Sequence, residues 1–117
     1  MWQEMPGVGR LSLGEVFEEA DGPCVFECRS EAGKTYLVFR VAEEDGADVW
    51  LLVPMSKGRL DEVRSGRVPL RDSVQRCEFG EVILATVSFD GIPQVRFMLP
   101  AEVPDCDLPT PDAYLSL

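Results

Sequence analysis

The chain has no histidine, so the residues that could do chemistry are its acidic side chains and four cysteines. Histidine is the usual general base and the group that most often activates a serine or cysteine nucleophile. The acidic pairs Glu18–Glu19 and Asp61–Glu62 are adjacent in sequence, in predicted loops or on helix surfaces, where we expect both carboxylates to face water. A working acid–base pair needs burial or forced proximity to separate its two pKa values. We therefore expect no catalytic residue and a protein that is not an enzyme.

The four cysteines are the side chains whose spacing could hold a zinc ion or form a disulfide. On a strand, Cys24 and Cys28 would stand about 13 Å apart at about 3.3 Å per residue, too far to share a zinc ion or a disulfide. Cys106 lies between two aspartates, whose negative charge disfavours a thiolate. We expect reduced thiols, with no metal ion and no other cofactor.

The formal net charge of −10 bears on the choice of partner. An acidic surface repels phosphate backbones and anionic lipids, so we expect neither nucleic-acid nor membrane binding. The same charge can serve solubility alone, attract a basic partner or mimic a nucleic acid. No apolar run approaches the roughly 20 residues that span a bilayer, and residues 1–10 do not have the pattern of a secretory signal. We expect a cytoplasmic protein.

Residues 57–76 reverse this charge, with six basic residues against three acidic ones, a local +3 while the remainder carries −13. Ser56 is a suitable N-cap for a helix that Gly66 ends, and Pro69 suits the start of a second helix. This helical pair and the apolar C-terminus are the expected contact surface. Its predicted residues are Arg59, Arg64, Arg67, Arg71, Arg76, Tyr114 and Leu115.

Strands are expected on both sides of the helical pair. The uninterrupted apolar run from Trp50 to Val53 is typical of a strand buried on both faces. The segments 24–29 and 35–41, which precede this run, are also expected to be strands. The acidic loop between 43 and 48 is too short for the calcium loop of an EF-hand, so we expect a solvated hairpin tip there. Together these strands predict an antiparallel meander.

Further elements are expected at the C-terminal and N-terminal ends of the sheet. The segments 81–89 and 92–99 flank Asp90–Gly91, a strong signal for a β-hairpin. Residues 11–20 can be read as a helix or as an edge strand, because Ser12 and Glu15 match a capping box while Gly14 weakens the helix.

These segments predict a single α+β domain over residues 11–99. Its antiparallel sheet has five or six strands, a meander plus a C-terminal hairpin, and two short inserted helices cover one face. Residues 1–10 are expected to form an N-terminal arm. Residues 100–117 contain four prolines and four acidic residues, so we expect an extended tail.

Several short motifs lie between Leu13 and Val87. They are Asp21-Gly22-Pro23, Gly33-Lys34-Thr35-Tyr36-Leu37, Asp45-Gly46, Trp50-Leu51-Leu52-Val53-Pro54-Met55-Ser56, Arg59-Leu60, Ser65-Gly66 and Pro69-Leu70-Arg71-Asp72. In these motifs the chain resembles a family of short uncharacterised bacterial proteins, a domain of unknown function. The resemblance covers about two thirds of the chain; it implies a bacterial, cytosolic setting and supplies no catalytic residues.

Three hypotheses about function follow. The first is a non-catalytic module that regulates or accompanies a protein partner, or that pairs with itself as a homodimer. The second is a small-molecule sensor or enzyme with a pocket beside Trp50 and Tyr36, which a deep apolar cavity with convergent polar groups would favour. The third is an acidic inhibitor of a nucleic-acid-binding protein, in which carboxylates are spaced like phosphates.

Overall fold

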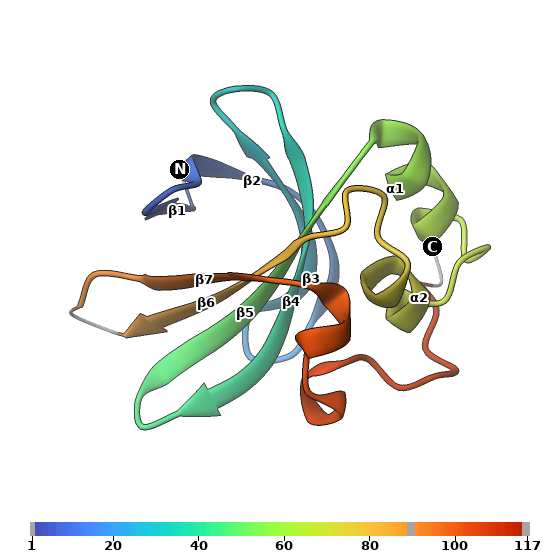
Figure 1. Ribbon diagram of the computed structural model, residues 1–117. Coiled ribbons are helices and arrows are strands. Elements are labelled where there is room, and N and C mark those ends of the chain that lie inside the picture. The colour runs from blue at the N-terminus through green and yellow to red at the C-terminus, as the bar shows by residue number, and fades with distance from the viewer. Residues whose placement is uncertain (1, 89–90, 116–117) are drawn as a thin grey trace.

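A computed structural model describes residues 2–88 and 91–115 (Figure 1). Within these residues, seven antiparallel strands pair in chain order as one sheet. The strands are β1 (Gln3–Met5), β2 (Gly9–Glu19), β3 (Pro23–Ser30), β4 (Thr35–Glu44), β5 (Ala47–Met55), β6 (Val82–Ser88) and β7 (Gln94–Met98). The helices α1 (Lys57–Arg64) and α2 (Leu70–Gln75) lie between β5 and β6, and the short 3₁₀ helices η1 (Pro100–Glu102) and η2 (Asp105–Asp107) follow β7.

The prediction of an α+β fold with five or six strands and two helices covering one face is wrong. In the described residues the sheet has seven strands and curls into a nearly closed barrel, so the protein is mostly antiparallel β-structure (Figure 1). The two short helices lie beside this barrel. The number of strands was underestimated because a three-residue strand has too few residues to show a pattern of alternation.

That missing strand lies in the segment predicted to be an N-terminal arm at residues 1–10. From Gln3 onward the segment instead forms β1, which pairs with β2, and the amide of Trp2 donates to the carbonyl oxygen of Leu11 at 2.7 Å. Gly7, in the turn that follows, lies against the ring of Phe97 on β7. The first and last strands therefore approach each other at this turn, which nearly closes the barrel.

The barrel interior is filled by side chains from all seven strands. Its centre is a group of three aromatic rings in edge-to-face geometry, with centroid distances of 4.9 Å for Trp2–Phe26, 5.3 Å for Trp2–Trp50 and 5.5 Å for Phe26–Trp50. Such pairs add about 0.5–1.5 kcal/mol each beyond the area they bury. Tyr36 is buried in the same cluster, and neither Tyr36 nor Trp50 lines the cavities described below. Both residues are therefore packed among the side chains of the barrel interior.

A second core cluster lies on the outer side of the barrel. It joins outward-facing residues of β3, β4 and β5 to apolar residues of both helices and of the C-terminal segment. Leu51 and Leu52, neighbours on β5, are both fully buried, one in each cluster. The prediction of a strand buried on both faces is confirmed.

The helix boundaries follow the predicted signals closely. The Ser56 hydroxyl accepts from the Arg59 amide at 3.2 Å and so caps α1. Gly66 has the positive φ of 81° that a helix-terminating glycine adopts. Pro69 differs from the prediction by one position, because it precedes the first residue of α2 as its N-cap.

Two of the remaining predictions concern strands and turns. Residues 11–20, for which helix and strand were both considered, belong almost entirely to β2. A Cβ on Gly14 would come within 2.5 Å of the Glu27 carboxylate, so the glycine lets this side chain lie across the strand. The 43–48 loop is a tight turn at Asp45 and Gly46, both with positive φ. The turn predicted at Asp90–Gly91 falls partly on Asp90, which lies outside the described residues.

The C-terminal segment, predicted to be an extended tail, packs on the outer side of the barrel over residues 100–115. The helices η1 and η2 shorten it, and Val103 and Leu115 are buried in the outer core cluster. Prolines at the start of each turn suit a 3₁₀ helix, because their fixed φ and missing N–H cost nothing there. The segment is thus part of the fold.

Candidate functional site

The C-terminal segment is held in place from α2. Arg71 donates from Nε to the carbonyl oxygen of Pro109 at 2.7 Å and from Nη1 to the Asp105 carboxylate at 2.7 Å. The amide of Leu70 donates to the carbonyl oxygen of Ala113 at 2.9 Å. Because these contacts lie several residues apart, they fix the path of the segment across the outer face of the sheet.

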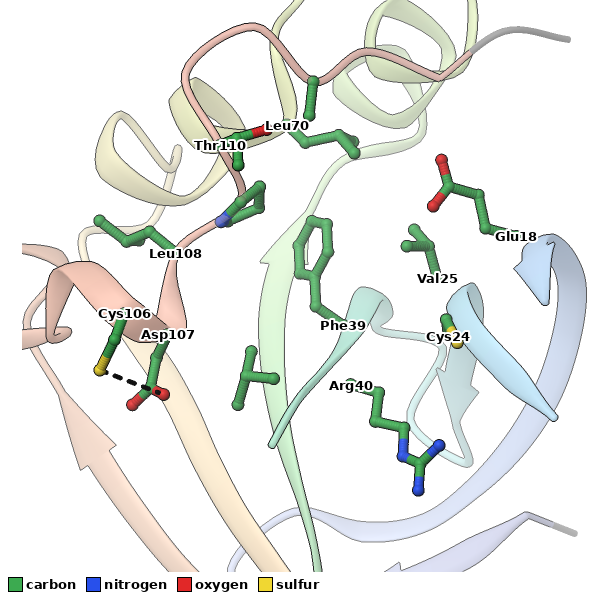
Figure 2. Close-up of a pocket in the computed structure, with 13 residues that line it drawn as sticks. Glu18, Cys24, Val25, Phe39, Arg40, Leu70, Cys106, Asp107, Leu108 and Thr110 are labelled. Atoms are coloured by element: carbon green, nitrogen blue, oxygen red, sulfur yellow. Dashed lines mark hydrogen bonds between the residues drawn. The ribbon is translucent and has the colours of Figure 1, made fainter. Parts of the chain in front are cut away.

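Between this segment and the sheet lies an open groove of about 300 Å³ (Figure 2). Figure 2 shows Phe39 in the middle of it, with Leu108 and Thr110 of the C-terminal segment on one side and Val25 and Glu18 on the other. The lining residues are Glu18, Cys24, Val25, Phe39, Arg40, Val41, Leu70, Cys106, Asp107, Leu108, Pro109, Thr110 and Ala113.

The groove has an apolar floor and acidic rims. Val25, Phe39 and Leu70 form the floor and belong to the outer core cluster. Glu18, near the end of β2, and Asp107, in η2, stand on opposite rims (Figure 2). Among the described residues, neither carboxylate has a basic group within 4.0 Å. Both rims therefore offer a negative charge beside an apolar floor.

One basic residue, Arg40, also lines the groove, but two carboxylates of its own hairpin surround its guanidinium. Asp48 accepts from Nε at 3.2 Å and from Nη2 at 2.8 Å, and Glu43 accepts from Nη2 at 2.9 Å. The hydrogen bond to Asp48, with the charges of Asp48 and Glu43, raises the pKa of Arg40 above its already high usual value. This cluster carries one net negative charge, so the groove as a whole is anionic.

The cysteines lie in two different environments. Cys24 and Cys106 line the groove. The Cys24 thiol donates to the carbonyl oxygens of Ala20 at 3.4 Å and Gly22 at 3.6 Å, and the Cys106 thiol donates to the Asp107 carboxylate at 3.9 Å. Cys28 is fully buried inside the barrel, where burial, with a smaller effect of the Glu27 charge, raises the pKa of its thiol to about 12. All four cysteines are unpaired. With this raised pKa, the Cys28 thiol stays protonated and is a poor nucleophile.

Two negative findings apply to the part of the chain that is described. No three of its histidine, cysteine and acidic side chains are placed to hold a metal ion together. Among its helices, none has the length and the apolar character needed to cross a membrane.

The structure distributes the predicted contact residues over different roles. Arg71 and Leu115 make contacts within the molecule, and Arg59 donates from Nη2 to the carbonyl oxygen of Arg76 at 3.3 Å. Arg64 pairs with Glu15 of β2 at 2.7 Å. Exposed side chains remain at four of the predicted positions, which are Arg64, Arg67, Arg76 and Tyr114. The helical pair therefore uses much of its positive charge internally.

Sequence reasoning did not find the groove residues Glu18, Phe39 and Asp107. They come from segments up to about 90 positions apart, which only the fold brings together. The one signal in the sequence that pointed to an acidic site was the composition of the C-terminal segment, which has four acidic residues and no basic one.

The comparisons with known proteins give a family without an assigned role. A family model described as "Family of unknown function (DUF6575)" matches residues 1–112. The chain belongs to this family. Membership in DUF6575 agrees with the expected resemblance to a domain of unknown function. The assignment of the short motifs between Leu13 and Val87 to that family, and the bacterial origin, stay predictions. Searches of curated proteins and of solved structures found no match for this DUF6575 protein.

Proposed function

We propose that this protein is a non-catalytic interaction module that binds a basic segment of a partner protein in the acid-rimmed groove of Figure 2. The observation that carries the proposal is the combination of an apolar floor at Phe39 with carboxylates on both rims, Glu18 and Asp107, that have no basic neighbour within 4.0 Å in the described residues.

The geometry suits a lysine or arginine side chain. Its aliphatic stem would lie on Phe39 and Val25, while its charged head would reach Glu18 or Asp107. The net charge of −10 adds long-range attraction that speeds the encounter with a basic partner.

This proposal moves the contact surface away from the helical pair. The arginines there would repel a basic partner, but Arg59, Arg64 and Arg71 are each engaged within the fold. The bacterial and cytoplasmic setting is part of the proposal, and four unpaired cysteines suit a reducing compartment.

Affinity capture from native cell extract tests the proposal when three forms of the protein are compared. The wild type should retain a basic partner, and the Glu18→Gln/Asp107→Asn variant should retain roughly fivefold less, since each exposed ion pair contributes up to about 1 kcal/mol. The matched control is Glu4→Gln/Glu31→Gln, which removes the same charge from two exposed partners of Arg10.

The control should capture as much partner as the wild type, and capture should weaken as salt is raised. Equal capture by the wild type and the groove variant would contradict the proposal. So would a loss of capture of the same size in the control, because overall charge would then explain the effect.

A further inference from the structure

A second cavity, of about 480 Å³, lies between the β3–β4 turn and the start of α1. Its volume falls within the roughly 300–1,000 Å³ typical of small-molecule sites. It shares no lining residue with the groove. The residues that line it are Gly33, Lys34, Thr35, Pro54, Met55, Ser56, Lys57, Phe79 and Glu81.

A set of hydrogen bonds fixes one wall of this cavity. Glu78 Oε1 accepts from the amide of Ser56 at 2.9 Å, and both of its carboxylate oxygens accept from the Ser56 hydroxyl at 2.9–3.0 Å. The loop after α2 is thereby tied to the first turn of α1. Phe79, the next residue, lines the cavity although 62% of its surface is exposed.

The charge at this cavity is opposite to that of the groove. Lys34, from the β3–β4 turn, and Lys57, from α1, both line it, and in the described residues neither ammonium has a carboxylate within 4.0 Å. Glu81 is the one acidic residue among the described lining residues. The nearby Glu78 does not line the cavity, because its carboxylate is hydrogen-bonded to Ser56. The cavity therefore presents two cations beside an apolar wall on a chain with a net charge of −10.

We propose that this cavity binds a small amphipathic anion. A carboxylate or sulfonate group would lie between the ammonium groups of Lys34 and Lys57, and an aromatic or aliphatic body would pack on Phe79 and Pro54. This site goes beyond the proposed function, because its ligand has the opposite charge and its residues are separate from those of the groove.

The probe that tests the site is 8-anilinonaphthalene-1-sulfonate, an aromatic anion that fluoresces when it leaves water. Titration into the wild-type protein should give saturable binding with one site. The neutral analogue N-phenyl-1-naphthylamine, which lacks the sulfonate, should bind at least roughly threefold more weakly if the lysines contribute as exposed ion pairs do. Equal binding of the two probes would overturn the assignment of an anion site.

Three variants locate the binding. Lys34→Gln/Lys57→Gln should weaken sulfonate binding roughly fivefold, and Glu81→Gln should strengthen it about twofold by removing a like charge. The matched control Arg67→Gln/Arg76→Gln removes two exposed cations elsewhere and should change binding less than about twofold at physiological salt. An equal loss in the lysine variant and the arginine control would overturn the proposal, as would the lack of saturable binding.

Discussion

The two sides of the sheet are both apolar, yet they are covered in different ways. The inner side closes on itself, and rings from Trp2, Phe26 and Trp50 fill the centre of the barrel. The outer side is covered by short pieces, namely two helices and the C-terminal segment, with a groove and a second cavity at their margins. The inner side is thus a closed core, whereas the outer cover leaves a groove and a cavity open, and we propose that binding occurs at these openings.

The largest effect should come from removing an inner ring. Trp50→Ala should lower the free energy of unfolding by about 3–5 kcal/mol, because the closely packed interior cannot fill the space that the indole leaves. Urea denaturation followed by circular dichroism measures this loss. A loss below about 1 kcal/mol would contradict the close packing of the barrel interior around Trp50.

A smaller effect is expected where the outer cover is attached. Arg71→Gln removes the charged donor to the Pro109 carbonyl oxygen and the pair with the exposed Asp105. It should cost about 1–2 kcal/mol and, in hydrogen exchange, raise the rates of residues 100–115 more than those of β5. Arg67→Gln is the matched control. Because Arg67 is exposed, this substitution should change the free energy of unfolding by less than about 0.5 kcal/mol.

An effect of similar size, present only at high pH, concerns Cys28 inside the barrel. The folded thiol has a pKa of about 12, against an ordinary value of 9.0. Above pH 9 the unfolded chain loses a proton that the folded chain keeps, so stability falls as pH rises, by about 1.4 kcal/mol at pH 10. The difference in unfolding free energy between wild type and Cys28→Val, measured from pH 7 to pH 10, should change by this amount. A constant difference would show that the thiol ionises equally in both states.

The local features of the fold could be read from the sequence. The apolar run from Trp50 to Val53, the cap at Ser56 and the glycine at 66 each depend on interactions within a few residues, and the structure confirms them. Closure of the barrel could not be read in this way. It depends on pairing a three-residue strand at Gln3–Met5 and on the approach of Gly7 to Phe97, which lie about 90 residues apart.

The groove was missed for a related physical reason. Each of its residues has an ordinary explanation in its own segment: Glu18 is one of two adjacent acids, Phe39 is an apolar strand residue, and Asp107 is in a proline-rich stretch. They become a site only because Arg71 holds the C-terminal segment against the sheet. The same contact explains why Leu115, predicted to face a partner, is buried in the outer core cluster.

The most direct test of the central claim, that the groove binds a basic segment of a partner, is photo-crosslinking in native cell extract. A photoreactive phenylalanine analogue would be placed at Thr110, which lines the groove, and for comparison at Leu13, an exposed residue of β2 that is not among the groove residues. The account predicts crosslinks from position 110 to a lysine- or arginine-rich segment, and none above background from position 13. Crosslinks to the same partner from position 13 and none from position 110 would contradict it.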